Sequence, residues 1–141
     1  MSSSAKKNHF LLLVVFVVFP LILAEIARSI NEGGLQPTII SADVLKAMKA
    51  LFIIFSIISF ITPWLIYKGV IPFQLKQNSI LVRINSEYTV LIVGYIYLFS
   101  PVIYGLVLFF SGNAIAEFYY YVGISVTGTL AWSFLNFRNP I

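Results

Sequence analysis

The sequence predicts an all-α integral membrane protein, a four-helix bundle built as two helical hairpins. Composition is the first observation: 60% of the 141 residues are hydrophobic, only 10% are charged, and the mean hydropathy is +0.95. Soluble domains carry about 25% charged residues. Since about 20 apolar residues are needed for one spanning helix, the length leaves room for three or four spans. Short polar segments divide the apolar sequence into four such runs.

The first two runs predict spans over about residues 10–30 and 42–67. The segment 31–34, Asn-Glu-Gly-Gly, ends the first span. Ser41 can cap the first amides of the second helix, and Asp43 lies near the positive end of its dipole. The two spans form the first predicted hairpin.

The second hairpin is predicted from the C-terminal half of the chain. After a mixed stretch rich in Lys, Gln and Asn, Ser86 and Glu87 indicate the start of a span over about 87–110. A Ser-Gly-Asn turn at 111–113 leads into the fourth span, about 114–137. The whole chain, 1–141, is therefore expected to form a single transmembrane domain.

The distribution of basic residues predicts the orientation. With the N-terminus in the cytoplasm, the cytoplasmic side carries Lys6, Lys7, Lys68, Lys76, Arg83 and Arg138, and the opposite side carries Arg28, Lys46 and Lys49. An excess of Lys and Arg marks the cytoplasmic side. Both termini are therefore expected in the cytoplasm, in a multi-pass protein of the bacterial inner membrane. No basic cluster occurs, so no nucleic-acid partner is expected.

Three prolines fall inside predicted spans, at Pro20, Pro63 and Pro101. Proline removes a helical hydrogen bond, which neighbouring helices or hydroxyls can compensate. Ser100 is positioned to do so beside Pro101. Two interpretations stay open: bends that serve packing in a small bundle, or a hinge or pathway through the membrane. The first is favoured because proline is common in membrane helices.

Small residues indicate where helices meet. Gly105 on the third span, and Gly123 and Thr127 four residues apart on the fourth, permit close backbone approach. Small residues dominate helix contacts in membranes, where apolar side chains alone do not favour a helix over lipid. We therefore expect these positions to be packing sites.

The sequence Ser-Pro-Val-Ile-Tyr-Gly at 100–105, within four short hairpin-linked spans, resembles the double-hairpin proteolipids of rotary ATPases and small bacterial four-span proteins. That resemblance implies an ion-binding carboxylate deep in a span. This chain departs from the pattern, because Thr62 and Ser100 are the polar groups at such depths. Two interpretations of Glu25 stay open: pairing with Arg28 at the outer interface, and an ion- or proton-handling role as the candidate functional acid. The first is favoured.

Metal, haem and enzymatic chemistry is largely excluded by the residues present. There is no cysteine, and His9 is the only histidine, so histidine-rich metal centres and bis-histidine haem cannot form within this chain. His9 is expected to contact water or lipid headgroups. No nucleophile, base and orienting group occur together. The chain is not expected to be an enzyme or to carry a cofactor or metal.

These observations predict a small non-catalytic membrane subunit that packs against a larger membrane complex and stabilises or positions it. The alternative is a homo-oligomer that conducts ions or small solutes. A third possibility is a lipid- or quinone-binding module between Tyr97, Tyr104 and Trp132. The stretch after the second span is the expected docking loop, because it combines basic and apolar residues: Lys68, Phe73, Lys76 and Arg83.

Overall fold

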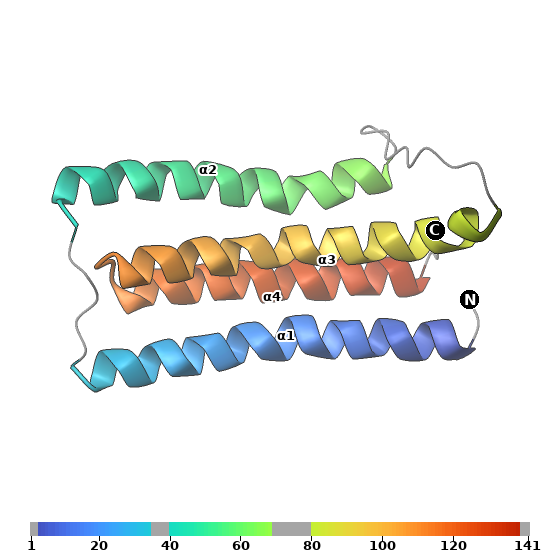
Figure 1. Cartoon of the computed structure of the whole chain (residues 1–141), viewed down its shortest axis with the longest axis horizontal. Helices are drawn as coiled ribbons and strands as arrows, with labels where there is room; N and C mark the ends of the chain where they lie inside the picture. The colour runs from blue at the N-terminus through green and yellow to red at the C-terminus, as the bar shows by residue number, and fades with distance from the viewer. Residues whose placement is uncertain (1–2, 35–39, 69–79, 139–141) are drawn as a thin grey trace.

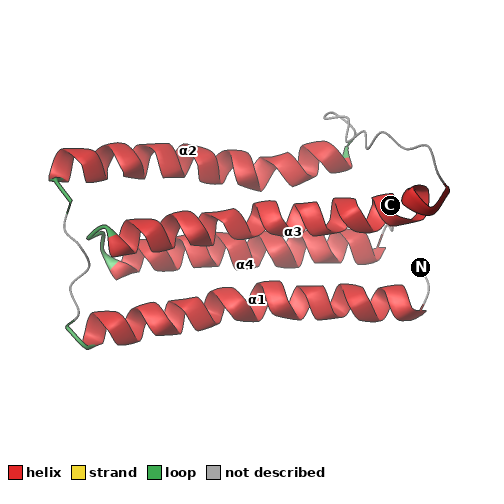
Figure 2. Cartoon of the chain, viewed as in Figure 1, coloured by secondary structure: helices red, strands yellow, loops and turns green. Residues whose placement is uncertain are grey.

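The computed structural model describes residues 3–34, 40–68 and 80–138, and these form four helices (Figure 2). The helices are α1 (Ser3–Glu32), α2 (Ala42–Tyr67), α3 (Ile80–Phe110) and α4 (Ile115–Arg138). α2 and α4 lie where the sequence predicts helices, whereas α1 and α3 begin earlier. In α3 the apolar residues from Ile80 onward propagate a helix through Ser86 and Glu87, which are interior positions and not its start.

α3 and α4 form a packed antiparallel hairpin at the centre, and α1 and α2 lie on opposite sides of it (Figure 1). α2 packs on α3, while α1 packs on α4 and, over a smaller area, on α3. The predicted four-helix bundle is confirmed as an all-α packed fold, and α1 and α2 are antiparallel, but the central pair separates them. The start of α1 and the end of α4 lie at the same end of the bundle (Figure 1), which we call the terminal end.

Three helices contain stretches long and apolar enough to cross a membrane, which is the pattern of a multi-pass membrane protein. The stretches are Lys7–Glu32, Ala42–Ile66 and Leu91–Phe110. Among the described residues, α4 is not apolar enough to qualify as a candidate membrane span, although its 24 residues extend about 36 Å. Its polarity comes from hydroxyl and amide side chains, several of them buried in the bundle: Ser125, Thr129, Ser133 and Asn136.

The turn between α3 and α4 depends on a glycine. Gly112 has φ 101°, in the left-handed region that glycine adopts without strain. Its amide donates to the Phe109 carbonyl at 3.1 Å, and the Asn113 amide donates to the Leu108 carbonyl at 3.0 Å. These two bonds form a Schellman motif, which satisfies the last carbonyls of α3.

The apolar core consists of two clusters along the bundle axis. The cluster nearer the α3–α4 turn contains Ala27, Val102, Phe109, Phe118 and Val122. The cluster nearer the terminal end contains Leu91, Tyr95, Leu98 and Trp132. Only 11% of the most apolar stretch of α1 and of α2 is buried, against 44% for α3. The outer helices therefore present most of their apolar surface to the surroundings.

Candidate functional site

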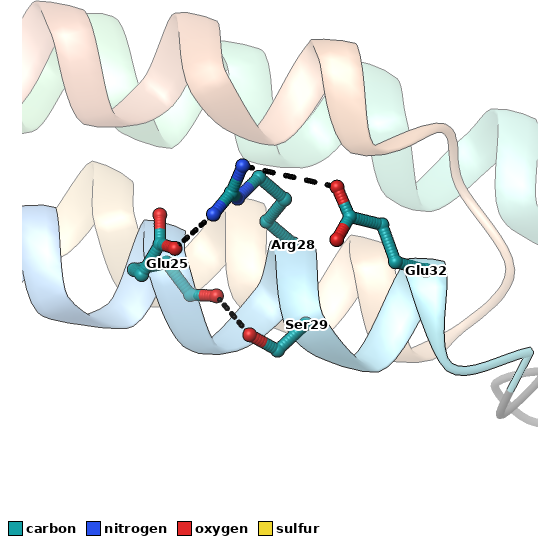
Figure 3. A network of polar contacts seen from close by, with 4 residues as sticks. All are labelled: Glu25, Arg28, Ser29 and Glu32. Atoms are coloured by element: carbon teal, nitrogen blue, oxygen red, sulfur yellow. Dashed lines mark hydrogen bonds and ion pairs between the residues drawn. The ribbon is translucent and has the colours of Figure 1, made fainter.

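Glu25, the candidate functional acid, lies on the exposed surface of α1 near its C-terminal end (Figure 3). Its carboxylate accepts a hydrogen bond from the Arg28 guanidinium one turn later, and Arg28 also pairs with Glu32 at 3.8 Å. Ser29 Oγ donates to the Glu25 carbonyl at 3.1 Å. The three charged side chains are more than half exposed. The charge of Glu25 is thus neutralised by Arg28 of the same helix, on the exposed surface of α1.

The three prolines inside helices are fully buried, and the helix continues through each: Pro20, Pro63 and Pro101. Pro101 leaves the carbonyl of Tyr97 without its usual amide donor. The Ser100 hydroxyl does not reach that oxygen but donates to the Ile96 carbonyl at 3.0 Å. The hydroxyl therefore supports the preceding turn and does not replace the bond that proline removes.

Thr62 and Pro63 repeat this arrangement in α2. Pro63 frees the carbonyl of Ser59, whereas Thr62 Oγ1 donates to the Ile58 carbonyl at 2.6 Å. In both helices a hydroxyl directly before the proline bonds within its own helix. These hydroxyls are therefore occupied and do not project polar groups into a pathway.

The glycines of the central helices fall into two classes. A Cβ added at Gly105 would lie 2.8 Å from Cβ and Cγ of Tyr121, so the close approach of α3 and α4 requires glycine there. In contrast, a Cβ at Gly123 would meet nothing within 4 Å, and Gly123 and Thr127 are both exposed. These two predicted packing positions face outward within the described bundle and line a groove.

A buried polar cluster near the terminal end joins α1, α3 and α4. His9 is fully buried, and its Nε2 is hydrogen-bonded to the Tyr95 hydroxyl at 2.9 Å and lies 3.4 Å from Ser133 Oγ. Phe16 stacks on the Tyr95 ring with centroids 5.2 Å apart. The expectation that His9 contacts water or headgroups is therefore wrong. Its position seven residues before Phe16, on the same helix face, is the sequence signal that could have placed it inside.

Two further hydroxyls continue this polar face along α4. Ser125 and Thr129 precede Ser133 at intervals of four residues and are fully buried. Within the described part of the chain neither hydroxyl has a hydrogen-bond partner. Buried hydroxyls without partners are uncommon and costly in apolar surroundings. The buried face of α4 thus carries three hydroxyls, those of Ser125, Thr129 and Ser133.

A groove of about 930 Å³ lies between α2 and α4 and is open to the outside of the bundle. It exists because α2 packs on α3 and leaves space beside α4. Apolar or small side chains line most of it, including Ile53, Ile57 and Ile61 of α2 and Gly123, Ile124 and Thr127 of α4. The Ser56 hydroxyl in its wall is buried and has no partner among the described residues.

One end of the groove is charged. Lys49 Nζ donates to Glu117 Oε1 at 2.9 Å, and Asn113 Nδ2 donates to Glu117 Oε2 at 2.6 Å. Lys49 comes from α2, Asn113 from the α3–α4 turn and Glu117 from the first turn of α4. The ion pair therefore lies at the end of the bundle opposite the terminal end, where α2 and α4 begin. The sequence carries no signal for this ion pair, because Lys49 and Glu117 lie far apart in the chain.

The expected docking loop lies mostly outside the described residues. Phe73 and Lys76 fall in the range 69–79, and Arg83 belongs to the first part of α3. Lys68 is exposed and follows the last turn of α2, where its amide donates to the Trp64 carbonyl at 3.0 Å.

The three aromatic residues of the possible lipid or quinone module lie in different surroundings. Tyr97 is exposed on α3, and Tyr104 stacks on Phe52 with centroids 5.2 Å apart. Trp132 is fully buried, with its ring edge-on to Trp64 at 5.5 Å. The contacts of Tyr104 and Trp132 are those of helix packing.

Within the described residues, no group of three or more His, Cys, Asp or Glu side chains is placed to hold a metal ion. The chain matches no protein-family model, no curated protein and no solved structure. The similarity to rotary proteolipids therefore stays a resemblance of predicted topology and of the short 100–105 sequence.

Proposed function

We propose that this protein is a non-catalytic integral membrane subunit that packs beside a larger membrane protein and stabilises or positions it. The observation that supports this role is the distribution of polarity. The polar side chains His9, Tyr95 and Ser133 bond to one another inside the bundle, and Glu25 is paired on the exposed end of α1. Towards the membrane, α1 and α2 offer apolar surface, which is suited to packing.

The outer face of α1 is the proposed contact surface. Its exposed apolar residues recur every three or four positions and form a ridge along the helix: Leu11, Val15, Val18, Ile22 and Ile26. Such a ridge can pack against a helix of a partner protein. We propose that the protein lies in the bacterial inner membrane with the terminal end in the cytoplasm, as the basic residues indicate.

Cross-linking tests this role directly, because the chain contains no cysteine. A single cysteine at Val18, on the outer face of α1, should form one cross-linked product of defined mass with a partner in native membranes. Ala27→Cys is the matched control, because Ala27 is only 1% exposed and should not react. A Val18→Cys chain that stays uncross-linked and migrates as a monomer would contradict the proposal.

A conducting homo-oligomer is the second candidate, and the buried hydroxyls of α4 favour it. Ser125 and Thr129 lack partners among the described residues and align with Ser133 on one buried face of α4, which leaves two hydroxyls available to bind a solute that enters the bundle. Ion flux measured in liposomes distinguishes the two functions. Flux that Thr129→Val abolishes would favour conduction, whereas the absence of flux together with a defined cross-linked partner would favour the subunit.

A further inference from the structure

The groove between α2 and α4 combines a charged end with an apolar body. The Lys49–Glu117 pair, joined by Asn113, occupies one end, and Ile53, Ile57 and Gly123 belong to the apolar part. Its volume, about 930 Å³, lies within the range of about 300–1,000 Å³ that is typical of ligand sites. A molecule that matches this polarity has one polar end and one hydrocarbon end.

The length of the groove along α2 is close to the thickness of the hydrocarbon layer of one membrane leaflet. Along α2 it extends from Lys49 to Ile61, which is about 18 Å at the helical rise of about 1.5 Å per residue. Half of a hydrocarbon core of about 30 Å is about 15 Å. Because the charged end lies near the starts of α2 and α4, a lipid of the leaflet at that end can place its headgroup there and an acyl chain along the groove.

The charges select the headgroup. Lys49 and Glu117 are side by side and of opposite sign, and each keeps about a third of its side chain exposed. A phosphate can accept hydrogen bonds from Lys49 Nζ, and an adjacent primary ammonium can donate to Glu117. An anionic headgroup places its negative charge beside Glu117, and a choline headgroup has no N–H to donate. Opposite charges at one site therefore favour a zwitterionic headgroup with a primary ammonium.

We propose that this groove binds one phospholipid of the ethanolamine type, with its headgroup on the Lys49–Glu117 pair and an acyl chain against Ile53, Ile57 and Gly123. This binding is independent of the proposed subunit role, which uses the outer face of α1. The small size of Gly123 keeps the groove open, since nothing lies within 4 Å of the position of a Cβ there. A larger side chain at Gly123 therefore fills the lipid site without disturbing the bundle.

Native mass spectrometry of the full chain in detergent tests the lipid site. The probes are phosphatidylethanolamine, phosphatidylcholine and phosphatidylglycerol with identical acyl chains. Wild type should retain one phosphatidylethanolamine, with about tenfold preference over the other two lipids, as expected for one charge-assisted hydrogen bond. Gly123→Leu should lower retention of all three lipids about tenfold or more, while the melting temperature should not fall below the wild-type value, because leucine favours the helix more than glycine does.

The charge variants separate headgroup recognition from acyl-chain binding. Glu117→Gln should reduce the preference for phosphatidylethanolamine while a lipid is still retained, and Lys46→Gln should change nothing, because Lys46 is exposed on α2 and does not line the groove. Equal retention of the three lipids by wild type would overturn the proposal. A wild-type dimer that Gly123→Leu converts to a monomer, with lipid retention unchanged, would also overturn it and assign the groove to a second copy of the chain.

Discussion

Replacing Gly94 of α3 by alanine should lower the free energy of unfolding, because this glycine lies against the Trp132 indole of α4. An added Cβ would come within 2.5 Å of Cζ2 and Nε1 of the ring. The ring cannot move aside easily: it is fully buried, its Nε1–H donates to the Leu91 carbonyl at 3.4 Å, and it packs edge-on against Trp64. Overpacking of this kind costs about 1–3 kcal/mol, and a rigid neighbour places the cost in the upper part of that range.

Gly123→Ala is the matched control for this prediction. Both variants exchange glycine for alanine inside a helix, a change that favours the helix by up to about 1 kcal/mol. That gain is common to both variants, so the difference between their free energies of unfolding isolates the effect of the contact with Trp132. Gly94→Ala is expected to be less stable than Gly123→Ala by about 2–3 kcal/mol.

Unfolding in mixed micelles with increasing dodecyl sulfate, followed by tryptophan fluorescence, measures this difference. Trp64 and Trp132 are in contact, so their emission should change when the helices separate. In a Trp132→Leu background the Gly94→Ala cost should largely disappear, since the two residues are coupled only when the indole is present. Equal stability of Gly94→Ala and Gly123→Ala, within about 0.5 kcal/mol, would refute the packing described for this site.

Three further predictions concern hydrogen bonds, the turn and the ion pair. His9→Phe leaves the buried Tyr95 hydroxyl with one partner fewer and should cost about 1–2 kcal/mol; the same unfolding titration measures it, and an added Tyr95→Phe that recovers none of the loss would argue against this bond. Gly112→Ala forces a side chain into φ 101° and should lower the melting temperature, at a cost of about 1–2 kcal/mol, so an unchanged melting temperature would mean that the turn relaxes. Lys49→Met should cost at most about 1 kcal/mol, because the pair with Glu117 is partly exposed; a much larger loss in the titration would show that the pair is shielded from solvent.

Helix positions along the chain could be predicted because their signals are local. Ser41 caps α2 by accepting a hydrogen bond from the Val44 amide at 3.4 Å, and Gly34 and Gly112 adopt the left-handed conformation where α1 and α3 end. These residues act through the backbone next to them, so their role can be inferred from a few neighbouring residues. The beginning of α3 was misplaced because Ser86 and Glu87 have the composition of a helix start yet are equally compatible with a helix interior.

The neighbours of each helix could not be predicted, for a physical reason. In a membrane, an apolar side chain that faces lipid and one that faces another helix have the same polarity, so hydropathy does not show how a helix is rotated. The exposure of Gly123 and Thr127 and the separation of α1 from α2 follow from rotation and order in the bundle. The polar groups at the groove end, Lys49 and Glu117, lie far apart in the chain, and only the fold brings them together.

The placement of α1 and α2 on opposite sides of the central pair has a consequence for biogenesis. Translation proceeds from the N-terminus, so these two helices enter the bilayer before either has a neighbour to pack against. Each of the two helices is surrounded by lipid or by the insertion machinery until the C-terminal half of the chain emerges. Assembly of the native protein thus waits for the last two helices, and the interval before their arrival is when quality-control proteases have the best access to the nascent chain.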